Sequence, residues 1–117
     1  MTTLSSTECE PVAVIIVRIR FAEGTGVKSR PAVVLTGGSY HASRPDTIVV
    51  ALSTQRRAEY YGDCDLVDWS SAGLPQPTKA KGVIQTIERT TVDRRLGTLS
   101  PADFERVRES LRLILGL

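Results

Sequence analysis

Short runs of aliphatic and β-branched residues are the feature that most limits the folds open to this chain. The clearest runs are five or six residues long and lie at 12–17, 32–36, 47–52 and 82–87. Runs of this length, rich in Val and Ile and bounded by Gly, Pro and Ser, are typical of strands buried in a sheet. A weaker strand at 59–67 and a short one within 92–99 bring the expected total to five or six.

The C-terminal segment carries the signals of a helix start. Ser100 is suited to cap a helix, and Pro101 is suited to its first position. Apolar residues then recur at helical spacing up to about residue 115, at Phe104, Val107, Leu111, Ile114 and Leu115. We therefore predict a mainly β fold of the α+β class, in which a small, strongly curved sheet or barrel is packed by a C-terminal helix.

The longer connections carry turn signals. Two glycines at 37–38 are followed by the polar residues 40–46, and this segment predicts a loop. Residues 69–74 predict a short helical turn that ends at Gly73.

A length of 117 residues indicates one domain with its own core. Residues 1–10 are polar and acidic, which predicts a disordered tail rather than a secretory leader, and 11–117 form the domain. No apolar run reaches transmembrane length, so we expect a soluble cytoplasmic protein that does not associate with a membrane. With a net charge of only +2, any anion-binding site must be local.

One stretch, 24–35, combines glycines, two cations and a proline ahead of an apolar run. Glycine lets the loop bend, and Pro31 biases Arg30 toward an extended conformation at the mouth of a strand. A guanidinium held there is suited to a phosphate. The alternative is a solvated basic turn.

Other polar groups lie at strand ends and on strand faces. Arg18 and Arg20 share one face of the first predicted strand, where they form either a basic wall or a solvated face. Ser53 and Thr54 follow the third strand, as turn formers or as groups of a site.

Several side chains are candidates of a weaker kind. His41 has an ordinary pKa near neutrality and lies in the predicted loop. Tyr40, Tyr60 and Tyr61 can stack on bases, although ordinary packing is the expected role of each. Cys64 is expected to be a small core residue. One histidine and two cysteines predict no metal site.

Six segments carry a resemblance to a known family: 17–21 (VRIRF), 24–35 (GTGVKSRPAVVL), 48–53 (IVVALS), 68–74 (DWSSAGL), 85–88 (QTIE) and 95–100 (RLGTLS). In this order and spacing they resemble the MazF/PemK toxins of bacterial type II toxin–antitoxin modules. The resemblance covers about 12–117 and implies an SH3-like β-barrel assembled as a homodimer. It also implies an endoribonuclease that cuts single-stranded RNA at short motifs, uses no metal or other cofactor, and is inhibited by an antitoxin protein.

The resemblance assigns roles to individual residues. The family's arginine before the proline corresponds to Arg30, and its catalytic threonine corresponds to Ser53, which keeps the hydroxyl. Thr54 takes that role if the register slips by one residue. Some relatives also use an acid near 79–82, but this segment reads KAKG, so no aspartate is transferred and the general base stays open. The cations expected to line a path for the RNA backbone are Arg18, Arg20, Lys28, Lys79 and Lys81.

The resemblance thus implies a toxin that cleaves mRNA and thereby inhibits translation and growth. The alternative is a non-catalytic module of the same fold that binds RNA or a peptide, since the threonine is replaced and the acid is missing. A small-molecule enzyme has no support, because the chain has no glycine-rich phosphate loop between a strand and a helix and no catalytic triad pattern.

Overall fold

A six-stranded antiparallel sheet forms the body of the computed structural model, which describes residues 10–20, 27–54 and 60–117. The predicted tail therefore lies, except for Glu10, outside the described residues. Along the chain the elements are β1 (Ala13–Arg20), β2 (Val27–Val34), α1 (Gly38–Ser43), β3 (Asp46–Ser53), β4 (Cys64–Asp65), β5 (Lys79–Glu88), the 3-10 turn η1 (Arg89–Thr91), β6 (Val92–Thr98) and α2 (Pro101–Leu115). The strand order is β4-β5-β3-β2-β1-β6, so β4 and β6 are the edges of the sheet in this part of the chain.

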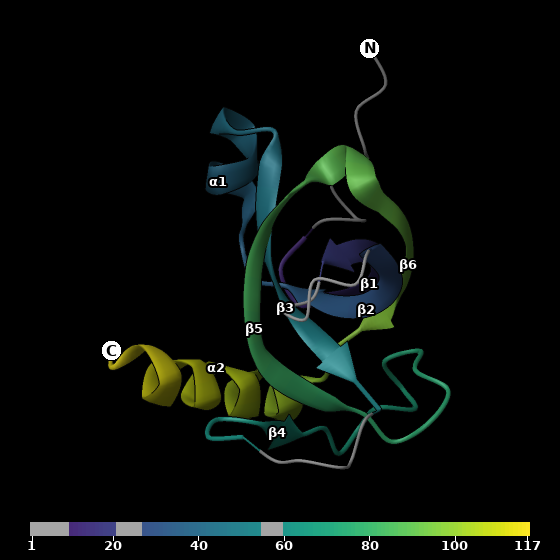
Figure 1. The fold of residues 1–117 in the computed structure, drawn as a ribbon, viewed down its shortest axis with the longest axis vertical. Helices are drawn as coiled ribbons and strands as arrows, with labels where there is room; N and C mark the ends of the chain where they lie inside the picture. The colour runs from purple at the N-terminus through teal and green to yellow at the C-terminus, as the bar shows by residue number, and fades with distance from the viewer. Residues whose placement is uncertain (1–9, 21–26, 55–59) are drawn as a thin grey trace.

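The sheet is strongly curved, as the sequence predicts. In Figure 1, β5 and β6 form an arc around β1 and β2. Ile87 of β5 and Val92 of β6 pack into one cluster with Ile15, Val34 and Val49, although no pairing joins β5 to β6. Apolar side chains from strands far apart in the sheet can meet in this way only if the sheet curls around them.

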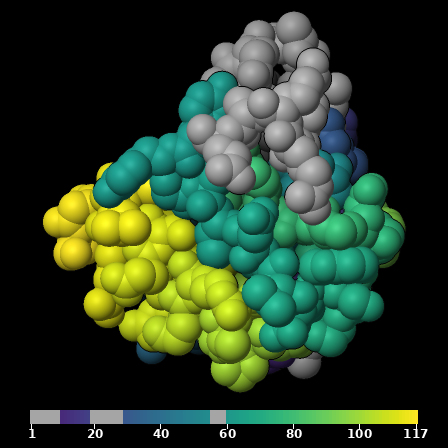
Figure 2. All heavy atoms as spheres, turned by 90° about the horizontal axis from the view of Figure 1, so that it is seen from below, coloured from purple at the N-terminus to yellow at the C-terminus, as the bar shows by residue number. Residues whose placement is uncertain are grey.

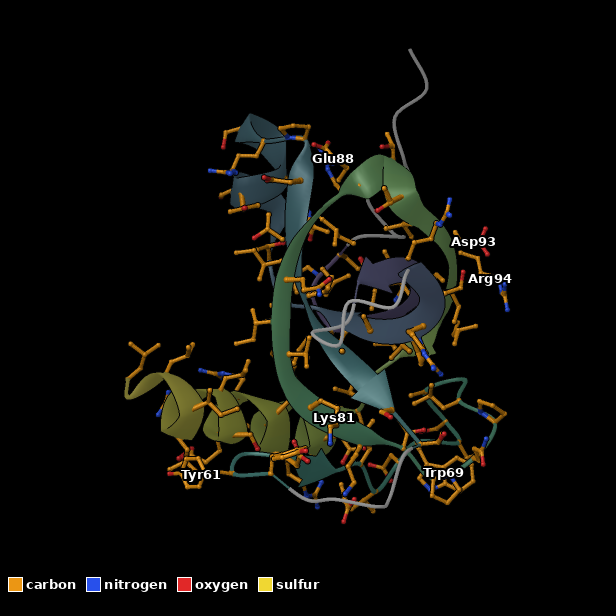
Figure 3. All side chains as sticks on the ribbon, viewed as in Figure 1. Tyr61, Trp69, Lys81, Glu88, Asp93 and Arg94 are labelled. Carbon is orange, nitrogen blue, oxygen red and sulfur yellow. The ribbon has the colours of Figure 1, made fainter. Side chains whose placement is uncertain are left out.

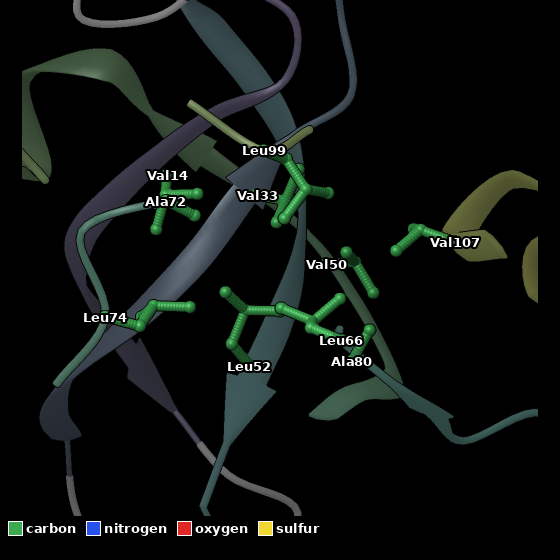
Figure 4. Close-up of a cluster of buried hydrophobic side chains, with 10 residues drawn as sticks. All are labelled: Val14, Val33, Val50, Leu52, Leu66, Ala72, Leu74, Ala80, Leu99 and Val107. Atoms are coloured by element: carbon green, nitrogen blue, oxygen red, sulfur yellow. The ribbon is translucent and has the colours of Figure 1, made fainter. Parts of the chain in front are cut away.

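The outer face of the sheet is covered by α2 and by the chain between β4 and β5. Its core consists of Val14, Val33, Val50, Leu52, Leu66, Ala72, Leu74, Ala80, Leu99 and Val107 (Figure 4). Seen from below, α2 and residues 60–80 lie side by side over this face (Figure 2). The predicted role of the C-terminal helix, which is to cover the sheet, is confirmed.

Helix α2 begins and ends where the sequence signals place it. The Ser100 hydroxyl accepts a hydrogen bond from the Asp103 backbone N–H at 3.1 Å, and Pro101 occupies the first turn. Gly116 ends the helix in a left-handed conformation, with φ of 71°. Glycine adopts this conformation without the steric penalty that other residues incur.

Asp103 ties the start of α2 to the chain after β4. Its side chain is fully buried, and its carboxylate accepts hydrogen bonds from the backbone N–H groups of Val67 at 3.0 Å and Asp68 at 2.7 Å. Arg106, one turn further along the helix, adds an ion pair at 2.8 Å. The buried carboxylate thus accepts hydrogen bonds from two backbone N–H groups that do not take part in strand pairing.

The loop prediction for 40–46 is wrong, because residues Gly38–Ser43 form helix α1. The six residues, GSYHAS, show no apolar periodicity that could have indicated a helix, and none of them is buried in the structure. Contacts from outside hold it instead. The Arg89 guanidinium donates to the carbonyls of His41 at 3.1 Å and Arg44 at 2.7 Å, which satisfies acceptors at the end of the helix.

The fourth predicted strand is much shorter than 59–67. Only Cys64 and Asp65 pair with β5. Cys64 is half-buried against the outer core, in agreement with its predicted packing role.

Candidate functional site

Strand register brings three of the predicted site residues to one end of the sheet. Ser53, the last residue of β3, lies opposite Lys79, the first residue of β5. On its other side β3 pairs with β2, and the last pair at this end is Ala32 with Ala51. Continued by two residues, this register places Arg30 opposite Ser53. We call Arg30, Ser53 and Lys79 the site row.

The members of the site row differ in their exposure. Arg30 is exposed and Ser53 is half-buried, whereas Lys79 is only 4% exposed. Thr54 directly follows β3 and is exposed. Arg30 is therefore the cation of the row that a ligand from solution reaches first, while Lys79 adds positive charge from beneath the surface.

A carboxylate lies beside the acid-free segment 79–82. The Lys81 ammonium forms an ion pair with Asp63 at 2.7 Å, in which the Asp63 side chain is 5% exposed. Burial alone would raise the pKa of Asp63. The hydrogen bonds from Lys81 and from the backbone N–H of Tyr60 outweigh burial, so this pKa lies below its usual range. Asp63 is consequently ionised near neutral pH.

Sequence reasoning did not select Asp63. It is 18 residues away from Lys81 along the chain, and no motif links the two. The short pairing of β4 with β5 brings them together, because Cys64 lies opposite Ala80, and Asp63 and Lys81 are the residues next to this pair in the two segments.

The remaining predicted RNA-binding cations lie on or near β1 and β2. Arg18 is exposed, but it lies opposite Ser29, whereas Arg30 lies opposite Val17. Successive residues of a strand point to opposite faces, so Arg18 and Arg30 point to different faces of the sheet. The side chains of Arg20 and Lys28 are outside the described part of the chain. The RNA contacts of all these cations stay predictions.

His41 belongs to a different polar cluster, at the other end of β3. Its Nε2 atom is 2.7 Å from the Thr36 hydroxyl and 2.8 Å from the Thr47 hydroxyl, and the two hydroxyl oxygens are 2.6 Å apart. Thr47 is fully buried. Six residues of extended strand, about 20 Å, separate Thr47 from Ser53 within β3. His41 therefore fastens α1 to the sheet and does not lie beside the site row.

The His41 cluster predicts a pH effect on stability. Burial and then the charge of Arg89 lower the pKa of His41 from its ordinary value. Below about pH 6.5 the unfolded chain therefore binds a proton more readily than the folded one, and protonation favours unfolding. We expect wild-type protein to lose more unfolding free energy between pH 7 and pH 5 than a His41→Gln variant, as measured by urea unfolding. Parallel losses in the two proteins would contradict this expectation.

Metal-binding and membrane-spanning features are absent from the described residues. Within 10–20, 27–54 and 60–117, no group of three or more His, Cys, Asp or Glu side chains is arranged to hold a metal ion. None of the helices described there is long and apolar enough to cross a membrane.

Comparison with known proteins gives a family and a fold. The model of a family described as PemK-like, MazF-like toxin of type II toxin–antitoxin system matches residues 11–115. No curated protein shows significant sequence similarity to this chain.

Solved structures with the same fold include several toxins. A mycobacterial endoribonuclease in complex with its cognate antitoxin superposes with a TM-score of 0.74 at 18% identity, over 92% of this chain and 95% of that one. The Mycobacterium tuberculosis toxin MazF-mt6 gives 0.72 at 22% identity, over 90% and 97% of the two chains. Deinococcus radiodurans MazF gives 0.72 at 16% identity, over 94% and 98%. At these identities the likeness shows a shared fold, which agrees with the predicted curved sheet and C-terminal helix.

Proposed function

Since the chain belongs to the PemK-like, MazF-like toxin family of type II toxin–antitoxin systems, we propose that it is an endoribonuclease that cleaves single-stranded RNA without a metal. The observation that carries the proposal is the site row, in which an exposed guanidinium, a hydroxyl and a buried ammonium come from three strands to one end of the sheet. Cleavage of mRNA would inhibit translation and growth.

The proposed reaction uses the ribose 2′-hydroxyl as its nucleophile. The 2′-oxygen attacks phosphorus, the bond from phosphorus to O5′ breaks, and a 2′,3′-cyclic phosphate and a 5′-hydroxyl are formed. One proton leaves the 2′-oxygen and one is delivered to O5′. Negative charge grows on the non-bridging phosphate oxygens, where fixed positive donors stabilise the transition state.

The site row is suited to the phosphate part of this chemistry. The planar guanidinium of Arg30 can donate to two phosphate oxygens at once. Lys79, whose side chain is buried, adds positive charge in surroundings with little water to screen it. The Ser53 hydroxyl can donate a hydrogen bond to the phosphate but is too weak a base to take the 2′-proton alone.

We further propose an antitoxin partner and a homodimer. One structure with this fold contains a mycobacterial endoribonuclease together with its cognate antitoxin. A partner segment that covers the site row of this chain would block RNA, and acidic side chains in that segment would complement Arg30. The protein is therefore expected to lose its activity when the antitoxin is present.

The decisive test of the proposed function is incubation of the purified protein with a long single-stranded RNA in EDTA. We expect discrete cuts with 2′,3′-cyclic phosphate ends. Ser53→Ala is expected to lower kcat/KM about tenfold to a hundredfold, because one hydrogen bond from a neutral hydroxyl to a charged phosphate is lost. Thr54→Ala and the matched control Ser29→Ala, which alters an exposed hydroxyl on β2, are expected to cut like wild type.

The outcomes separate the alternatives. If Thr54→Ala fails to cut and Ser53→Ala cuts normally, the hydroxyl role belongs to Thr54. Binding of several RNAs without any cleavage would instead favour the non-catalytic binding module, which the serine in place of threonine leaves open.

A further inference from the structure

Two neighbouring tyrosines are exposed in the turn that precedes β4. Tyr60 is 70% exposed and Tyr61 is 75% exposed, so the expectation that each packs into the protein is wrong. Only six of the 117 residues are aromatic. Exposed aromatic faces beside cations are the platforms on which unpaired bases stack.

Tyr60 has defined surroundings. Its ring lies over the Lys81 ammonium, 5.2 Å from nitrogen to ring centroid. The Asp63 carboxylate accepts hydrogen bonds from both the Tyr60 backbone N–H, at 3.0 Å, and Lys81, at 2.7 Å. The Asp63 carboxylate therefore holds two groups in place. These are the backbone of Tyr60 and the Lys81 ammonium that lies against the Tyr60 ring.

The turn from Tyr60 to Asp63 is also held from outside. Gly62 has a positive φ of 86°, and a Cβ atom at this position would lie 2.3 Å from the Ile114 side chain of α2. The Asp63 backbone N–H closes the turn by donating to the Tyr60 carbonyl at 3.0 Å. The turn thus packs closely on the helix, so the Tyr60 ring starts from a fixed backbone and its ordering on binding costs less.

One atom of this arrangement is not explained by stability. The Asp63 Oδ1 atom is buried and accepts no hydrogen bond from any residue that the structure describes. Leaving a buried polar atom unsatisfied costs free energy, so a pairing formed only for stability would be expected to satisfy both oxygens. The other oxygen, Oδ2, accepts both hydrogen bonds and thus joins the Tyr60 backbone to Lys81.

The turn also lies next to the site row. Lys81 is two residues from Lys79 along β5, a separation of about 7 Å. Lys79 lies opposite Ser53. The Tyr60 ring is therefore held over a residue of the same strand that contributes Lys79 to the site row, two positions further along.

We infer that Tyr60 is a stacking platform for one unpaired base of the RNA, with Lys81 holding the ring and Asp63 positioning both. This inference rests on the proposed function. Single-stranded RNA is bound by aromatic faces next to cations, because every base has a flat face that can stack. Tyr61 does not share the role, since Figure 3 places it below α2 and well away from Lys81.

Binding of 2′-O-methylated single-stranded RNA tests the inference, because this RNA has no 2′-hydroxyl and cannot be cut. Fluorescence anisotropy is expected to show that Tyr60→Ala and Tyr60→Leu weaken binding roughly tenfold to a hundredfold, the usual loss when one stacked base is released. Tyr60→Phe keeps the ring and is expected to bind within about twofold of wild type. Tyr61→Ala is the matched control, an exposed tyrosine whose loss is expected to leave binding unchanged.

Cleavage of ordinary RNA gives a second readout. Tyr60→Ala is expected to raise KM with little change in kcat, whereas Asp63→Asn, which weakens the hold on Lys81, gives a smaller rise. The inference is overturned if wild type binds and cuts RNA and Tyr60→Ala does the same with equal affinity, or if Tyr61→Ala is equally impaired. Failure of wild type to bind or cut any RNA would overturn the proposed function, and this inference with it.

Discussion

Replacing Arg30 with alanine is expected to lower kcat/KM for single-stranded RNA by at least about a hundredfold, the usual loss when one donor to a developing oxyanion is removed. Arg30 is the exposed cation of the site row, and the register of β2 and β3, continued by two residues beyond the pair of Ala32 with Ala51, places it opposite Ser53. No other member of the row offers a planar pair of donors to the phosphate. Arg30→Lys keeps the charge but loses the planar pair of donors, so we expect this variant to be more active than Arg30→Ala and less active than wild type.

The matched control is Arg94→Ala. Arg94 is also an exposed arginine, paired with Asp93 on the edge strand β6, and Figure 3 shows both side chains pointing outward from the sheet. Cleavage by this variant is expected to match that of wild type. Circular dichroism and the midpoint of thermal unfolding check that Arg30→Ala is folded. A folded Arg30→Ala protein that cuts RNA at the wild-type rate would remove Arg30 from the site.

Asp103→Ala is expected to lower the free energy of unfolding by about 3 kcal/mol, because two backbone donors lose the buried carboxylate that accepts their hydrogen bonds. These donors are the N–H groups of Val67 and Asp68. Strands do not pair this part of the chain, so no other interaction in the described structure replaces the carboxylate. Urea unfolding followed by circular dichroism measures the change.

Arg106→Ala is the control for Asp103. The Arg106 side chain is 44% exposed, so its ion pair with Asp103 is partly screened by water, and its loss is expected to cost less than about 1 kcal/mol. Asp103→Asn keeps one carbonyl oxygen and turns an N–H group toward the second donor, so an intermediate loss is expected. Equal stability of Asp103→Ala and wild type would show that water satisfies the two donors.

Local sequence patterns predicted the strands and the helix whose own residues carry an apolar run, an apolar stripe or a cap. The runs at 12–17, 32–36, 47–52 and 82–87 lie within or overlap β1, β2, β3 and β5. Helix α2 follows from its cap at Ser100 and its apolar stripe. Helix α1 carries no such pattern, because external contacts such as those of Arg89 hold it and none of its own residues is buried.

The sequence by itself determined the residue types of the candidate site. A guanidinium before a proline at Arg30 and a hydroxyl after a strand at Ser53 are visible in the linear chain. Their chemistry follows from the side chains alone, and so does the expectation that a ligand of this site is an anion.

Only the tertiary structure decided which of these groups lie together. The pairing of β3 with β5 places Ser53 opposite Lys79, and the pairing of β4 with β5 brings the unexpected Asp63 to Lys81. Arg18 and Arg30, by contrast, lie on the neighbouring strands β1 and β2 and point to opposite faces of the sheet. The physical reason is that hydrogen bonds between strands distant in sequence set the register, and a shift of one residue would turn every side chain of a strand to the other face.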